Sequence, residues 1–60
     1  MKNYNIYAAT ENDKYTIIDV IRNAGAVLTA VSGCGAGYYI QLDANQEQAD
    51  TINKRLDEVL

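Results

Sequence analysis

A chain of sixty residues with a single cysteine and no histidine can form one small domain, over residues 1–60, but neither an internal disulfide nor a histidine-based zinc site. Its five basic residues against eight acidic ones give a net charge of −3, so direct nucleic-acid binding is not expected and a protein partner with a basic surface is favoured. No apolar run approaches the roughly 18 residues of a membrane span, and we expect a cytoplasmic protein because cysteine is scarce and the N-terminus carries no export signal.

The first two predicted elements are a strand and a helix. The segment NYNIYAAT, residues 3–10, alternates apolar and polar side chains and is rich in aromatic and β-branched residues, as a half-buried strand does. Apolar side chains then recur at helical spacing and predict a helix over residues 13–24. Thr10, with Asp13 three residues later, resembles a capping box at its start, and Asn12 is an alternative cap. Gly25 suits its C-terminal cap.

The second half of the chain predicts two strands and a second helix. AVLTAVS, residues 26–32, is rich in β-branched residues, and YYIQLDA, residues 38–44, alternates again. Asn45 is a good N-cap residue with Gln48 at the third helical position, and an apolar stripe follows to the C-terminus.

The predicted order β-α-β-β-α belongs to the α+β class. We expect the strand–helix–strand unit to cross over right-handed if its two strands share one sheet. We therefore expect a three-stranded sheet of order 1-3-2 with two helices on one face, a truncated ferredoxin-like motif without its last strand.

The segment VSGCGAGYY, residues 31–39, has three readings: a phosphate-binding loop, a loop that carries a nucleophile, and a turn between strands. A phosphate-binding glycine motif opens a helix, whereas a strand follows here. Cys34 has no histidine to activate it, so we expect no catalytic residue and no enzyme. The remaining reading is a hairpin whose small residues, Gly33, Cys34 and Gly35 among them, form a contact tip.

The tyrosines indicate a binding surface. Tyr7 and Tyr39 project from adjacent predicted strands onto the sheet face that two helices leave uncovered, and Gln41 and Asp43 share that face. Tyrosine is amphipathic and stiff, which suits an interface anchor, although a solvated sheet face carrying a few aromatic residues is the alternative. Acidic residues near the predicted helix starts are explained by the helix dipole, so no metal site and no cofactor are expected.

The run VIRNAGAVLTAVSGCGAGYYIQLDANQEQADTINKRL, Val20 to Leu56, resembles the small-molecule-binding ACT domains in its succession of helix, "AG" turn, two strands and helix. It departs from them at the turn ATENDK, which lacks the glycine typical of that position, and in having no final strand after the second helix. No ligand-binding residue is carried over from the resemblance.

Two functions remain. The first is a small, acidic, non-enzymatic protein-binding module, a stand-alone inhibitor or adaptor that occludes a site on a larger protein. Phage and mobile-element inhibitors, anti-CRISPR proteins among them, have this profile. The alternative is a homodimeric ACT-like domain that senses a small molecule.

Overall fold

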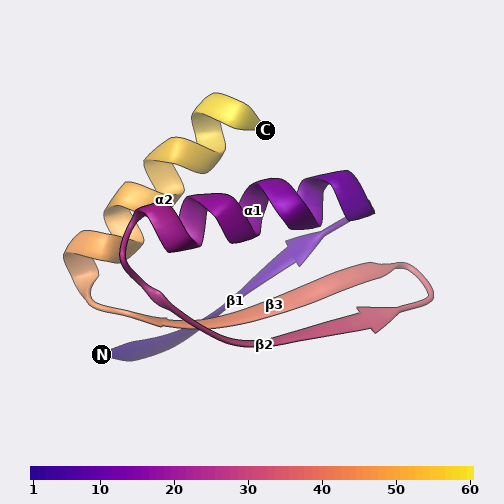
Figure 1. The fold of residues 1–60 in the computed structure, drawn as a ribbon, viewed down its shortest axis with the longest axis horizontal. Helices are drawn as coiled ribbons and strands as arrows, with labels where there is room; N and C mark the ends of the chain where they lie inside the picture. Colours follow the sequence, from indigo (N-terminus) through magenta and orange to yellow (C-terminus); the bar gives the residue numbers. More distant parts are fainter.

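The computed structural model describes the backbone of residues 1–60 and every side chain except that of Cys34. The elements follow the predicted order β-α-β-β-α: β1 (Lys2–Ala8), α1 (Glu11–Asn23), β2 (Val27–Cys34), β3 (Gly37–Ala44) and α2 (Gln46–Val59). They form an α+β fold of two layers, with both helices on the same side of the sheet (Figure 1).

The sheet has the predicted strand order β1-β3-β2, and β3 pairs antiparallel with both neighbours. In the first ladder Asn5 lies opposite Gln41, and the pairing extends over the whole of β1. The second ladder is interrupted between Leu28 and Ala30, where β2 contains one more residue than β3. This β-bulge resets the alternation of β2, so that Val31 returns to the helix side opposite Ile40.

Local side chains fix where the helices begin and end. The Thr10 hydroxyl accepts a hydrogen bond from the Asp13 amide, so α1 starts at the next residue, two positions before the predicted start. Asn45 and Gln48 form a reciprocal capping box at the start of α2, as predicted. The chain leaves α1 through Gly25 at a φ of 81°, a left-handed conformation that glycine adopts without a steric penalty.

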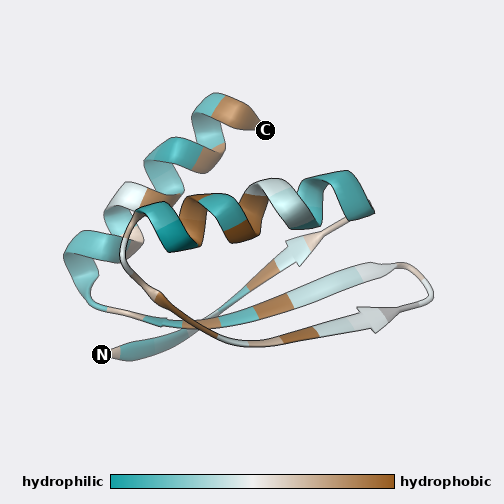
Figure 2. Cartoon of the chain, viewed as in Figure 1, coloured by the Kyte–Doolittle hydropathy of each residue, from teal (hydrophilic) through white to brown (hydrophobic). Residues whose placement is uncertain are grey.

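The core lies between α1 and the middle of the sheet, with α2 covering one end. Ile17, Ile21 and Ile40 are fully buried, and Ile52 joins them from α2. Figure 2 shows hydrophobic segments recurring along α1 and across the middle of the strands, whereas α2 is mostly hydrophilic. The apolar stripe of α1 and the even-numbered residues of β1 and β3 therefore face each other, as their spacing predicted.

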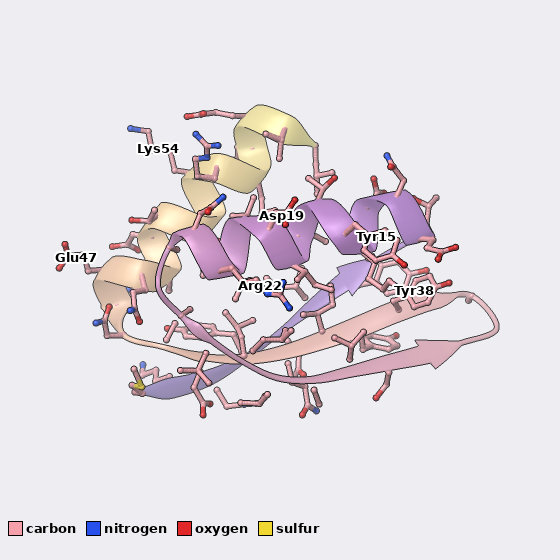
Figure 3. All side chains as sticks on the ribbon, viewed as in Figure 1. Tyr15, Asp19, Arg22, Tyr38, Glu47 and Lys54 are labelled. Atoms are coloured by element: carbon pink, nitrogen blue, oxygen red, sulfur yellow. The ribbon has the colours of Figure 1, made fainter. Side chains whose placement is uncertain are left out.

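At the other end of the sheet, the Lys14 side chain packs on two tyrosine rings on the helix side. The Lys14 ammonium lies 4.6 Å from the centre of the Tyr15 ring and 4.5 Å from that of Tyr38. Figure 3 shows these two tyrosines approaching each other from α1 and β3. Cation–π contacts of this kind tie the first turn of α1 to the sheet.

Candidate functional site

The sheet face opposite the helices is the candidate site, and it is built from all three strands. Its side chains come from the odd-numbered residues of β1 and β3, from Val27 of β2, and from Ala30 and Ser32, which the bulge turns outward. Three rows cross the face in the register of the sheet: Asn3, Asp43 and Val27; Asn5, Gln41 and Ala30; Tyr7, Tyr39 and Ser32. Each of these residues is exposed except Asp43, which is half-buried.

The two tyrosines of the last row contact each other. Tyr7 and Tyr39 are directly opposite in the β1–β3 ladder, with ring centres 5.4 Å apart and ring planes inclined by 56°. Tilted aromatic pairs at this separation are favourable beyond the area that they bury. About half of each side chain still faces solvent, 48% for Tyr7 and 49% for Tyr39. The result is a preformed aromatic surface at one end of the open face.

Tyr7 also holds the hairpin between β2 and β3. Its hydroxyl donates a hydrogen bond to the carbonyl oxygen of Ala36, in the two-residue turn. The ring reaches that carbonyl because Gly37 has no side chain: a Cβ there would lie 2.7 Å from the Tyr7 hydroxyl oxygen and 2.6 Å from the Ala8 carbonyl oxygen. Of the glycines in this segment, Gly37 is thus the one whose missing side chain allows β1 and β3 to approach closely.

The remaining residues of the predicted contact tip lie in different places. Gly35 is exposed in the turn, and a side chain added to it would meet nothing within 4 Å. Gly33 pairs with Tyr38, and a Cβ there would lie 3.5 Å from the Tyr38 ring, on the helix side. The side chain of Cys34 lies outside the described part of the structure. The structure therefore gathers Tyr7, Tyr39, Gln41 and Asp43 on one face and leaves Gly33 off it.

Asn3 is a residue of this face that sequence reasoning did not include among the site residues. Its side-chain amide donates to an Asp43 carboxylate oxygen at 3.2 Å and to the Leu42 carbonyl oxygen at 3.4 Å. The first of these bonds orients the Asp43 carboxylate at the end of the open face where β1 begins. Strand alternation already placed Asn3 and Asn5 beside Tyr7, so the signal was available for β1. For Ala30 and Ser32 it was not, because their orientation depends on the bulge.

The open face carries aromatic, amide, hydroxyl and small apolar side chains and, at Asp43, a carboxylate. Where side chains are described, no three Asp, Glu, His or Cys residues come close enough to hold a metal ion. Every buried side-chain polar atom among them has a hydrogen-bond partner. None of the helices in this part of the chain is both long and apolar enough to cross a membrane. The chemistry that the face does offer is aromatic contact, amide hydrogen bonding and one carboxylate.

No protein-family model, no curated protein and no solved structure matches this chain. The resemblance to ACT domains remains a likeness in the order of the elements.

Proposed function

We propose that this protein is a small non-enzymatic binding module that docks the open face of its sheet onto a larger protein and thereby blocks or recruits it. The observation that carries the proposal is the Tyr7–Tyr39 pair, half exposed on a sheet face that no described element covers. Interface anchors are enriched in tyrosine because a stiff ring buries a large apolar area and its hydroxyl can still form a hydrogen bond.

The tyrosines are held in place before any partner arrives. Tyr7 contacts Tyr39 and donates a hydrogen bond to Ala36, so little freedom is left for its ring to lose. Ordering a mobile side chain at an interface costs about 0.5–1.5 kcal/mol, and a preorganised anchor avoids much of that cost. This supports a binding role for the pair over that of a merely solvated surface.

Charge suggests the kind of partner. The protein carries a net charge of −3, and Asp43 contributes a carboxylate to the docking face itself. A basic surface on the partner is complementary to both, and this attraction mainly raises the association rate. Binding should therefore weaken as salt increases, because exposed charges are screened over a Debye length of about 8 Å at physiological ionic strength.

Phage and mobile-element inhibitors, including anti-CRISPR proteins, are the class of binding module that we put first. A cytoplasmic setting goes with this proposal, since a lone cysteine is typical of proteins in a reducing compartment.

The test compares two tyrosines of similar exposure on opposite sides of the molecule. Tyr39, 49% exposed, lies on the docking face, and Tyr15, 56% exposed, lies on α1. Once a partner has been captured from host lysate, Tyr39→Ala should weaken its affinity by about 2 kcal/mol or more, roughly thirtyfold, as loss of an interface anchor does. Tyr15→Ala should leave the affinity unchanged.

Two results would count against this function. Equal affinities of Tyr39→Ala and the wild-type protein would remove the sheet face from the account. Alternatively, a folded bait that captures no protein, together with a rise in melting temperature on adding an amino acid or nucleotide, would favour the small-molecule sensor. A ligand at one hundred times its dissociation constant stabilises its protein by about 2.7 kcal/mol, which such a thermal scan detects.

A further inference from the structure

The outer edge of β1 is open to pairing with another strand. Within the described residues nothing pairs with this edge, and from Asn3 to Ala8 the strand contains no charged residue, no proline and no bulge. Natural proteins place charged residues, prolines and bulges on edge strands to stop one sheet edge from pairing with another, and β1 lacks these protections from Asn3 to Ala8. The opposite edge, β2, is different, because the bulge between Leu28 and Ala30 breaks its regular pairing pattern.

An apolar groove accompanies the open edge. It has a volume of about 100 Å³ and lies between β1 and α2, which rises away from the sheet toward its C-terminal end (Figure 1). Its apolar lining comes from three elements: Tyr4 and Ile6 of β1, Leu42 of β3, and Ala49 and Ile52 of α2. Tyr4 and Ile6 are only half-buried and contact the core from its margin. A strand added beside β1 would cover them.

We propose that the added strand is β1 of a second copy, so that two molecules form a continuous six-stranded sheet around a two-fold axis at Asn5. Asn5 is the midpoint of β1, and an antiparallel pairing centred there uses all seven residues of the strand. Lys2 then lies opposite Ala8 of the second copy, and Asn5 lies opposite its own counterpart. The axis is perpendicular to the sheet and keeps all four helices on one side.

The sequence of β1 is self-complementary in this register. On the helix side, Tyr4 lies beside Ile6 of the second copy, twice by symmetry, next to the apolar groove that these residues line. Aromatic and β-branched residues form favourable cross-strand pairs. On the open side, the two Asn5 amides face each other and can exchange hydrogen bonds. No like charges are opposite each other, since Lys2 is the only charged residue of the strand.

Charge also favours a second copy at this edge. Most carboxylates lie on the helices, whereas β1 has none. Two copies with a net negative charge can therefore meet along β1 without placing carboxylates opposite each other. The pairing brings Lys2 to the end of β1 where Glu11 of the second copy begins α1. Opposite charges are thus near each other at both ends of the paired strands, where like charges would have been unfavourable. The β1 edge of each copy is then paired with that of the other. The assembly stops at a dimer because the remaining edges are the two β2 strands, which are bulged.

This inference does not depend on what the open face binds, and self-association can be measured on the purified protein alone. The wild-type protein should sediment at twice its monomer mass of 6.6 kDa and dissociate on dilution. Its melting temperature should rise with protein concentration, as it does for any fold stabilised by association.

The register is tested with single cysteines in a Cys34→Ser background. In Asn5→Cys the two thiols lie on the two-fold axis, with Cα atoms about 4.5–5.5 Å apart, within the range of a disulfide. In the matched control Asn3→Cys, on the same strand and face, the two thiols are four residues apart, about 13 Å at roughly 3.3 Å per residue. Mild oxidation should therefore link Asn5→Cys into covalent dimers many times faster than Asn3→Cys.

A charge exchange gives a second readout. Asn5→Lys and Asn5→Glu should each dimerise several-fold more weakly than the wild-type protein, because like charges directly opposite are unfavourable, and a mixture of the two should recover the dimer. Equal cross-linking rates for the two cysteine variants would overturn the register. A wild-type protein that sediments as a monomer at every concentration would overturn the dimer.

Discussion

Substituting Gly37 by alanine tests how the open face is assembled. Gly37 is buried at the start of β3 with a φ of 148°, a conformation that residues with a side chain rarely adopt. A Cβ at this position would lie 2.6 Å from the Ala8 carbonyl oxygen, 2.7 Å from the Tyr7 hydroxyl oxygen and 2.9 Å from the Tyr7 ring. The Tyr7 ring could rotate away, but the Ala8 carbonyl belongs to the backbone of β1. The strand itself therefore has to move.

Two costs add in this variant. A residue with a side chain held in such a sparsely populated backbone conformation costs about 1–3 kcal/mol. Forcing an extra carbon into a filled site costs a further 1–3 kcal/mol or so, less whatever movement of the strand relieves. We expect the free energy of unfolding to fall by about 2–4 kcal/mol. Since 1 kcal/mol shifts the midpoint of a small domain by about 4–8 °C, the melting temperature should fall by roughly 10–30 °C.

Gly35→Ala is the matched control, because Gly35 lies two residues away in the same hairpin and a Cβ there would meet nothing within 4 Å. Its unfolding free energy should stay within about 0.5 kcal/mol of the wild-type value. Urea unfolding followed by far-ultraviolet circular dichroism measures both variants, at one protein concentration so that self-association does not bias the comparison. If Gly37→Ala is as stable as Gly35→Ala, then β1 and the hairpin do not meet as described.

Three further substitutions test the same fold. Tyr7→Phe removes the hydrogen bond to Ala36 and should cost about 0.5–1.5 kcal/mol of unfolding free energy, with faster hydrogen exchange at the hairpin; unchanged exchange would contradict this. Asn45→Ala removes half of the capping box of α2 and should cost about 1 kcal/mol in urea unfolding, whereas no loss would show that the cap is not formed in solution. Ile40→Ala empties a fully buried position and should cost about 2–5 kcal/mol, a loss that a cooperative core requires.

The fold was predictable from the sequence where a capping residue or the spacing of apolar side chains decides the local structure. Strand alternation placed Tyr7 and Tyr39 on the same face, and the capping residue Asn45 marked the start of α2, whereas Thr10 and Asn12 were both candidate caps for α1. Boundaries were less accurate. The predicted start of α1 was two residues late, although a Thr10 cap implies helical geometry from the next residue. The predicted end of β2 was two residues early, because Gly33 and Cys34 continue the ladder up to a two-residue turn.

Two features of the site could not be predicted, because they depend on contacts between distant segments. The hydrogen bond from Tyr7 to Ala36 joins residues 29 positions apart and requires the close approach of β1 that Gly37 permits. The bulge between Leu28 and Ala30 leaves no signature in AVLTAVS, yet it decides which β2 side chains reach the open face. A glycine-rich segment indicates that another part of the chain can approach its backbone closely, but it does not show which strand does so.

The most direct test of the proposed docking face is the footprint of the partner on this protein in solution. Side-chain amide signals in nuclear magnetic resonance spectra report each surface separately: Gln41 lies on the open sheet face, whereas Gln46 lies on α2. When the captured partner is added to isotope-labelled protein, the signals of Gln41 should shift or broaden and those of Gln46 should stay in place. The reverse pattern, with the α2 signals affected and the sheet signals unchanged, would contradict the account.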